Sequence, residues 1–454
     1  MTTSRSGRHA SETGAGRDGE NPVRGLVKSR APHLSLLVIG LVFILLARLV
    51  FYFAIPFCAE DFYITARACF DPAYRAAATS SVWAIGIAPG PEVLARTWSL
   101  LGDAGAVYAA WRILPTLGYV AFLAYWVSPF FTGSSVSGLE THLAACAVLA
   151  ARIWPVGYAL AASLRPDTAL LALCSSGGKW RWAVAGIGVL IVANLTFAGH
   201  LLPQTITSKA LTYGIHPGAW GWLHPQGFGW ETLALIPALG AVPLLPVLAA
   251  LAFLITHVVL GTPQFWWYAV PPLAALGFAA CQAITRPRHL IAALILMVSF
   301  FGGQCDILHS RVLQEQELWA VGGDLAALHP KGTILLEPAG MIPYQNPGLK
   351  VIDDVGLLDP WMAERRKAGN GWRTDAIARY KPDWIVLRLR EYVRPERWSI
   401  GETMPYYSKA DAKLPGYVVV YSPGAKRLGG KAVQISLKSS SLVILKRKAE
   451  LVHK

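Results

Sequence analysis

The chain has 454 residues, of which 54% are hydrophobic and only 15% are charged. Soluble domains carry about 25% charged residues, so this composition excludes an ordinary soluble enzyme and indicates segments adapted to lipid. The net charge of +14 could favour nucleic acid as a partner. The sequence holds no nucleic-acid-binding motif, however, and anionic membrane lipids or a lipid-phosphate substrate fit the charge better.

The charged residues are distributed unevenly along the chain. Residues 33–304 contain 8 acidic and 12 basic residues, whereas residues 305–454 contain 16 acidic and 23 basic residues. This contrast predicts a multi-spanning helical membrane domain over 33–304 and a soluble domain over 305–454. Residues 1–32 are polar and lack periodicity, which indicates a disordered tail.

The first apolar run, residues 34–57, is long enough to cross a bilayer. Arg24, Lys28 and Arg30 precede it, and the positive-inside rule therefore places the N-terminus in the cytoplasm. The run is too long for a signal peptide, and the residues after it offer a poor cleavage site. We expect an uncleaved anchor followed by an outer loop over 58–102.

Further apolar runs follow between residues 104 and 303, but their boundaries are less regular. Basic residues at 179–181 and 286–288 indicate cytoplasmic turns. The last run, 289–303, would then deliver the C-terminal domain to the outer side. The runs at 141–151 and 167–176 are too short to cross a membrane. They fit half-helices, re-entrant elements or the remains of a shortened domain.

The C-terminal domain alternates between strand-like and helix-like patterns, which predicts an α/β fold. Helical patterns cover 312–328 and 360–380. The predicted strands are 332–337, 350–353, 383–388, 417–421 and 442–446.

The 6 cysteines show no metal-type spacing. Cys58, Cys69 and Cys305 fall outside the predicted membrane segments, so a disulfide among them is one option. The sequence also lacks a Walker loop, a dinucleotide fingerprint and a serine hydrolase elbow, which removes those classes of enzyme.

An acidic pair, Glu60-Asp61, follows the first membrane helix directly. A carboxylate at this depth could act as a general base toward a hydroxyl group. The alternative is a solvated helix end with interfacial charge. Two adjacent carboxylates could also hold Mg²⁺ or Mn²⁺, although nothing nearby completes a set of metal ligands, so no cofactor is assigned.

Other scarce charges interrupt the apolar segments. Glu140 follows a small-residue turn, where it could bind a ligand or simply face the helix dipole. Arg165 and Asp167 flank a proline that breaks a helix. They could neutralise each other, or Arg165 could hold an anionic group such as phosphate.

A polar loop then leaves another helix, with His200, Gln204 and Lys209 in sequence. Tryptophans follow it, as they do near 266–267, and aromatic faces of this kind suit either a sugar or a membrane interface. In the soluble domain, the loops 337–344 and 353–360 follow strands. They could carry function, with Tyr344 as one candidate, or merely turn the chain.

The order of these pieces resembles the lipid-linked-sugar glycosyltransferases of the C superfamily, in particular the group that includes the mycobacterial terminal arabinofuranosyltransferase. That group shows an acidic-acidic-small-aromatic-Ile-Thr motif after its first helix, and Ser-Gly-Leu-Glu-Thr, Arg-Pro-acidic and Leu-Leu-Pro-Asn-Thr motifs further on. Three more motifs lie in its soluble domain. The matching segments here are 60–67, 137–141, 165–167, 201–205 (with Gln204 replacing Asn), 337–344, 353–360 and 381–387.

This resemblance implies an inverting glycosyltransferase of the bacterial inner membrane with a periplasmic C-terminal domain. The donor would be a polyprenyl-phosphate sugar, with arabinofuranose suggested by kinship, and the acceptor a cell-envelope glycan or lipid. Asp61 would be the catalytic base. The resemblance gives the other residues substrate-binding roles: Glu60 and Glu140 toward sugar hydroxyls, and Arg165, Lys209, Arg67 and His200 toward the phosphate.

The chain departs from the group in one respect. Residues 103–134 barely leave room for the cytoplasmic hairpin that the group has after its second helix. A single crossing over 104–127 would place 137–141 on the opposite side from Asp61. A polytopic transporter or flippase, or a non-catalytic scaffold for envelope assembly, is therefore kept as an alternative.

Overall fold

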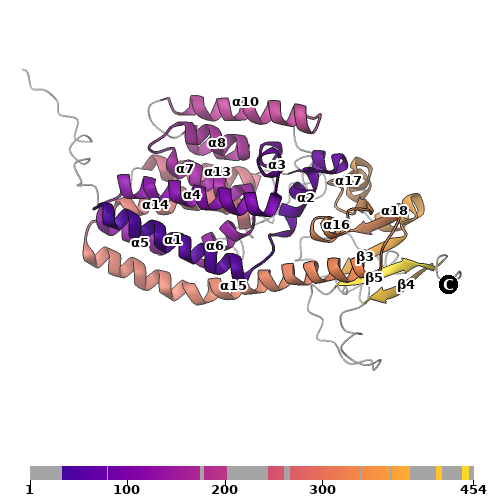
Figure 1. The fold of residues 1–454 in the computed structure, drawn as a ribbon. Helices are drawn as coiled ribbons and strands as arrows, with labels where there is room; N and C mark the ends of the chain where they lie inside the picture. The colour runs from indigo at the N-terminus through magenta and orange to yellow at the C-terminus, as the bar shows by residue number, and fades with distance from the viewer. Residues whose placement is uncertain are drawn as a thin grey trace, which may run out of the picture.

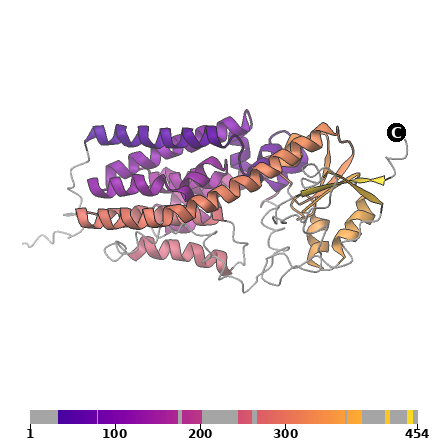
Figure 2. The same ribbon diagram turned by 90° about the horizontal axis from the view of Figure 1, so that it is seen from below.

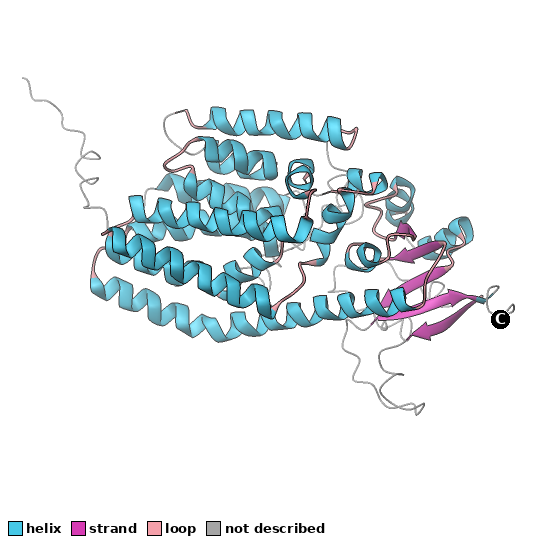
Figure 3. Ribbon diagram, viewed as in Figure 1, coloured by secondary structure: helices cyan, strands magenta, loops and turns pink. Residues whose placement is uncertain are grey.

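The computed structural model describes residues 33–173 except 79, and residues 178–201, 244–259, 266–337, 339–368, 371–388, 416–421 and 442–448. A bundle of helices occupies one end of the molecule and a small sheet with its own helices occupies the other (Figure 3). One long helix, α15 (Pro287–Ala327), runs along the bundle and into the sheet domain (Figures 1 and 2).

Short buried helices form the interior of the bundle. In α7 every residue from Glu140 to Leu149 is buried, which explains why its sequence shows no polar face. The neighbouring helices are α1 (Leu34–Ala54), α4 (Pro91–Ile113), α5 (Thr116–Trp126), α6 (Pro129–Val136), α8 (Val156–Leu164), η3 (Pro166–Thr168), α9 (Ala169–Leu173), α10 (Trp180–Phe197), α13 (Leu244–Val259), η6 (Trp266–Ala269) and α14 (Val270–Gln282).

The segment predicted as an outer loop, 58–102, is largely helical. It contains α2 (Glu60–Ala68), η2 (Pro72–Ala77) and α3 (Ser81–Ile87), and α4 already begins at Pro91. The loop prediction was wrong because polar residues interrupt the helical repeat of apolar residues in these segments. Short helices that pack against a second domain do not need a continuous apolar stripe.

The apolar run over 104–127 belongs to two helices. Leu114 is extended with ψ 147° and Pro115 follows it, which ends α4 and starts α5. The two helices form the hairpin for which the sequence seemed to lack room. The chain therefore returns to the side where it started, and the Ala59 N–H donates to the Ser137 carbonyl at 2.9 Å.

Among the helices that the structure describes, α1, α10 and α15 are long and apolar enough to cross a membrane, judged by length and composition. Many of their apolar side chains are exposed, including Val38, Phe53, Val189 and Val298. This agrees with a region adapted to lipid. The expected domain boundary at 304/305 falls inside α15, which continues without a break and includes the helix predicted at 312–328.

The five strands agree with the sequence prediction to within one residue at each end. They are β1 (Thr333–Leu336), β2 (Lys350–Asp353), β3 (Trp384–Arg388), β4 (Tyr417–Tyr421) and β5 (Leu442–Arg447). The sheet order is β2-β1-β3-β5-β4, with β1 parallel to β2 and β3, and with β5 antiparallel to β3 and β4.

Helices cover both faces of this sheet, as its alternating side chains require. On one face Ile334 and Leu336 pack against the end of α15. On the other face Leu335 packs against α17 (Pro360–Lys367) and α18 (Trp372–Tyr380). The predicted helix over 360–380 is therefore two helices. A short helix, α16 (Met341–Gln345), connects β1 to β2.

The disulfide left open by the sequence does not form. Cys58, Cys69 and Cys305 are free thiols, and Cys58 is buried.

Candidate functional site

A cavity of about 360 Å³ lies where the helical bundle meets the loops of the sheet. Part of its wall is apolar and comes from the bundle, with Ile55, Phe57, Val136, Leu308 and Val312. A concave site with an apolar wall and a few polar groups is typical of ligand binding. The polar side chains in the wall are Glu60, Asp61, Ser137, Arg311, Gln314, Glu315 and Glu337.

Helix α2 brings Asp61 to this cavity. Both acids of the Glu60-Asp61 pair lie in its first turn, where the positive end of the helix dipole favours carboxylates. The segment before the helix is fixed by the hydrogen bond from Ala59 to Ser137. Asp61 is partly exposed and lines the cavity, which is the position expected of a residue that contacts a ligand.

Glu60 has a different environment from its neighbour. Its carboxylate accepts the backbone N–H of Gly340 and, at 2.8 Å, that of Met341, while its own N–H donates to Glu315 Oε2 at 3.0 Å. Burial raises the pKa of Glu60 to about 7, although the two backbone hydrogen bonds oppose this rise. Glu60 thus joins α2 to the sheet domain, a role that the sequence did not indicate.

These contacts also bear on the predicted metal option. Both oxygens of Glu60 already accept amide hydrogens from Gly340 and Met341. A divalent cation shared by Glu60 and Asp61 would have to compete with those bonds. The pair therefore does not fit a joint Mg²⁺ or Mn²⁺ site.

Arg67, predicted to bind substrate, is buried at the same junction. Its guanidinium donates to the carbonyls of Pro343 at 2.7 Å and Leu349 at 3.1 Å. It also pairs with Asp71 at 3.0 Å and lies 4.4 Å from the Tyr74 ring centroid. These partners engage its planar fork, so the structure gives Arg67 a role in joining the two parts of the chain.

The Ser137–Thr141 segment lies beside the acidic pair. Ser137 lines the cavity. Gly138 has φ +74°, and a Cβ there would meet Cys58 Sγ at 2.8 Å, so glycine permits the close approach of this turn to the start of α2. Glu140 follows at the first turn of α7 and is buried.

Arg165 and Asp167 form a buried cluster behind the cavity wall. Arg165 Nη2 lies 2.6 Å from Asp167 Oδ2, and Arg165 Nη1 lies 3.7 Å from Glu140 Oε1. His257 Nε2 lies 3.1 Å from the same Asp167 oxygen. Arg165 also stacks over Tyr268, the residue after the cavity-lining Trp267. Arg165 and Asp167 therefore lie near the cavity, but they do not line it.

The remaining predicted residues lie elsewhere. Tyr344 packs its ring against Tyr63 at a centroid distance of 4.8 Å, and burial raises its pKa. His200 is exposed just beyond the end of α10 and is absent from the cavity wall. Gln204 and Lys209 lie outside the residues that the structure describes.

Helix α15 contributes polar residues to the cavity that were not predicted from the sequence. Arg311 lies 4.6 Å from the centroid of the Trp266 ring, and Glu315 follows one turn later. Arg311 and Glu315 were hard to recognise from the sequence because both lie in a charged helical stretch that is typical of a solvent-exposed face. Continuation of the last apolar run into this stretch would have placed them at the membrane surface.

The strand-end loops flagged by sequence divide into two kinds. Glu337 and Ala339, after β1, line the cavity together with Val355 and Leu357, after β2. By contrast, Asp353 is fully buried and accepts backbone N–H groups from its own loop, including that of Val355 at 3.0 Å. For Asp353 turn chemistry is a sufficient explanation.

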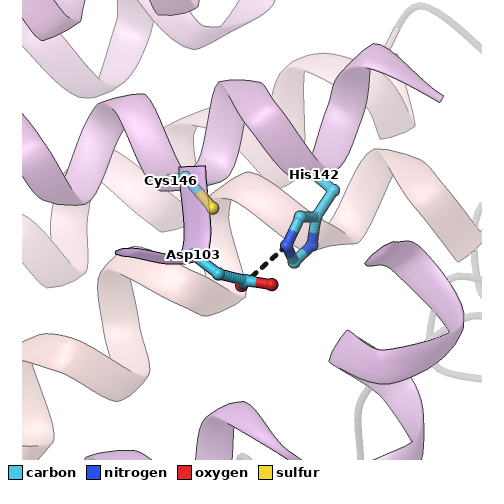
Figure 4. Close-up of side chains that lie close together, drawn as sticks. All are labelled: Asp103, His142 and Cys146. Atoms are coloured by element: carbon cyan, nitrogen blue, oxygen red, sulfur yellow. Dashed lines mark hydrogen bonds and ion pairs between the residues drawn. The ribbon is translucent and has the colours of Figure 1, made fainter. Parts of the chain in front are cut away.

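A second cluster of potential ligand atoms lies inside the bundle, formed by Asp103, His142 and Cys146 (Figure 4). The Asp103 carboxylate already accepts hydrogen bonds from Arg48 at 3.0 Å and from the Trp126 indole at 2.6 Å. It also lies 2.9 Å from His142 Nε2. A cation would have to displace the Arg48 guanidinium to bind there, so the cluster fits a structural polar network better than a metal centre.

Comparison with known proteins gives one match. Residues 311–435 match a family model described as a domain of unknown function, DUF8728. The match starts at Arg311 on α15 and covers most of the sheet domain. No curated protein and no solved structure matches this chain.

Proposed function

We propose that this protein is a membrane-embedded, inverting glycosyltransferase that moves a sugar from a polyprenyl-phosphate donor to a hydroxyl of an envelope glycan or lipid. The observation that carries the proposal is the position of Asp61. This carboxylate lines a partly open cavity beside the Ser137 turn and the loops after β1 and β2. Four of the motifs on which the family resemblance rests thus meet at one site.

The direction of the long helices supports an outward-facing site. Helix α10 begins beside Lys179 and α15 beside Arg286, and both helices end at the sheet domain, where Phe197 packs near Leu357. Under the positive-inside rule the basic ends are cytoplasmic. The cavity and the sheet domain then lie on the periplasmic side of a bacterial inner membrane, where lipid-linked sugars would be the donors.

The proposed reaction needs one base. The Asp61 carboxylate takes the proton of the acceptor hydroxyl, whose oxygen attacks the anomeric carbon of the donor sugar. The bond between that carbon and the phosphate oxygen breaks, and its electron pair leaves with the polyprenyl phosphate. Attack from the face opposite the leaving group inverts the configuration. The charge that develops on the phosphate requires a nearby cation.

The sheet domain would supply the acceptor side of the site. In parallel α/β sheets, ligands bind beyond the carboxyl ends of the strands. Here the loops that follow β1 and β2 at that edge, with Glu337 and Leu357, form part of the cavity wall. We assign the acceptor to this edge and the lipid donor to the apolar wall from the bundle.

A transporter or flippase for an envelope lipid is the second candidate. The short, interior helices α7 and α8 resemble the broken helices of many transporters. Such a protein would use the same cavity but would need no base at Asp61. A scaffold for envelope assembly would need neither the cavity nor a base at Asp61.

The test is Asp61→Asn in the full chain, purified and placed in lipid nanodiscs. With farnesyl-phosphoryl arabinofuranose as donor and a short arabinan as acceptor, we expect transfer to fall about 10²- to 10⁴-fold, the usual contribution of a general base. Asp306→Asn is the matched control, because it makes the same change at an exposed carboxylate of α15 that does not line the cavity, and it should leave transfer unchanged.

Normal transfer by Asp61→Asn would contradict the assigned role of this residue. Lipid movement across vesicles without sugar transfer by the unsubstituted protein would favour the flippase instead. Mass spectrometry of envelope glycans from a deletion strain would identify the sugar that is lost.

A further inference from the structure

The charges in the cavity wall are strongly unequal. Among the described residues that line it, four carry carboxylates and one carries a guanidinium, Arg311. The carboxylates belong to Glu60, Asp61, Glu315 and Glu337. A phosphate that enters this space is repelled by most of the polar wall, so the position beside Arg311 is the most favourable one for an anion.

Arg311 is held in a defined orientation. Its guanidinium lies over the Trp266 ring at 4.6 Å from the centroid. Trp266 in turn packs edge-on against Phe130 at 6.0 Å and Trp267 at 5.8 Å. An arginine that stacks one face on an aromatic ring can still direct its N–H groups, which lie in the guanidinium plane, toward an oxyanion.

The surroundings of Arg311 distinguish a lipid phosphate from a soluble one. Leu308 and Val312 come from the same stretch of α15 and also line the cavity, as do Phe57 and Val136 from the bundle. An anionic headgroup at Arg311 therefore lies in the same cavity as apolar side chains. Those side chains suit the first units of a prenyl chain. Inorganic phosphate would gain nothing from this wall.

We infer that Arg311 is the residue that holds the phosphate of the lipid donor. This assignment rests on the proposed glycosyltransferase function and gives Arg311 the role for which the sequence offered Arg165 and Lys209. Arg165 lies behind the cavity wall with Asp167 and Glu140, whereas Arg311 lines the cavity and has Glu315 one helical turn away. As the glycosidic bond breaks, the leaving phosphate gains negative charge, and the fixed guanidinium of Arg311 stabilises it.

The test measures binding rather than turnover. Farnesyl phosphate and farnesol are titrated into the full chain in nanodiscs, with tryptophan fluorescence as the readout, because Trp266 touches Arg311. We expect the unsubstituted protein to prefer farnesyl phosphate, and Arg311→Gln to weaken farnesyl phosphate about 10- to 100-fold while leaving farnesol unchanged. Arg311→Lys should retain part of the preference.

Arg288→Gln is the matched control, since Arg288 is an exposed arginine near the other end of the same helix. It should leave both affinities unchanged. Inorganic phosphate should compete only weakly; competition as strong as that of farnesyl phosphate would overturn the assignment to a lipid. An Arg311→Gln protein that keeps the full preference for phosphate, or an unsubstituted protein with no such preference, would also overturn it.

The outcomes separate this inference from the proposed function. If Arg311 governs binding of farnesyl phosphate but no sugar is transferred, the phosphate site stands and the glycosyltransferase proposal fails. If sugar is transferred and Arg311→Gln leaves the donor KM unchanged, the function stands and the assignment of Arg311 fails.

Discussion

Charged side chains occur in two regions of this molecule under contrasting conditions. Inside the bundle, Arg48 and Asp103 are almost completely buried, and each has partners within the protein. At the cavity, Asp61 and Arg311 line a partly open space between the bundle and the sheet domain. The first region holds its charges for structure, and the second presents them to a ligand.

The same contrast separates two adjacent residues. Both acids line the cavity, but Glu60 directs both of its carboxylate oxygens to the backbone of 340–341. Adjacent positions on a helix point about 100° apart, so one acid can join two domains while its neighbour faces a ligand. Proximity in sequence therefore says little about a shared role.

The largest effect is expected inside the bundle. Arg48→Met should destabilise the protein by about 3–5 kcal/mol, because it leaves the buried Asp103 carboxylate without its guanidinium partner. Thermal unfolding in detergent, followed by tryptophan fluorescence, measures this change. The double variant Arg48→Met, Asp103→Asn should recover part of the loss. An unchanged melting temperature for Arg48→Met would mean that this region is not structural.

A smaller effect is expected where Glu60 meets the sheet domain. A Cβ at Gly340 would lie 2.1 Å from the Glu60 carbonyl oxygen. Gly340→Ala should therefore destabilise the junction by about 1–3 kcal/mol, the usual cost of overpacking. Limited proteolysis and thermal unfolding report it. Gly348→Ala is the control, because a Cβ there meets nothing within 4 Å. An equal loss of stability in both variants would show that the close approach of Glu60 to Gly340 is not the cause.

A third effect concerns pH. The pKa of Glu60 is raised by burial from 4.5 to about 7 in the folded protein, so the folded state binds its proton more tightly than the unfolded state. The stabilisation is complete below about pH 4.5 and is lost as the pH rises toward 7. Asp353 behaves in the same direction, since burial raises its pKa to about 7.

Melting temperatures of the unsubstituted protein and of Glu60→Gln, measured between pH 5 and 8, would test this. About two of the pH values should lie below the Glu60 pKa and about two above it. Relative to Glu60→Gln, the unsubstituted protein should lose stability as the pH rises. Parallel curves would show that Glu60 does not titrate in this range.

The sequence by itself determined the local features of this protein. Its apolar first helix, its five strands and the change in charge density after residue 304 all follow from short-range patterns, because burial in lipid or in a sheet repeats over a few residues. The acidic pair after α1 could also be recognised, since acids are rare in that half of the chain.

Only the tertiary structure decided which charges meet. The hairpin of α4 and α5, hidden in one apolar run, returns Ser137 to Asp61. The unbroken helix α15 brings Arg311 to the cavity, while Asp167 holds Arg165 behind its wall. The physical reason is that a lone charged residue has the same local sequence whether it pairs internally or faces a ligand. Its partners can be neighbours in the sequence, as Asp167 is for Arg165, or can lie far away, as Gly340 and Met341 do for Glu60.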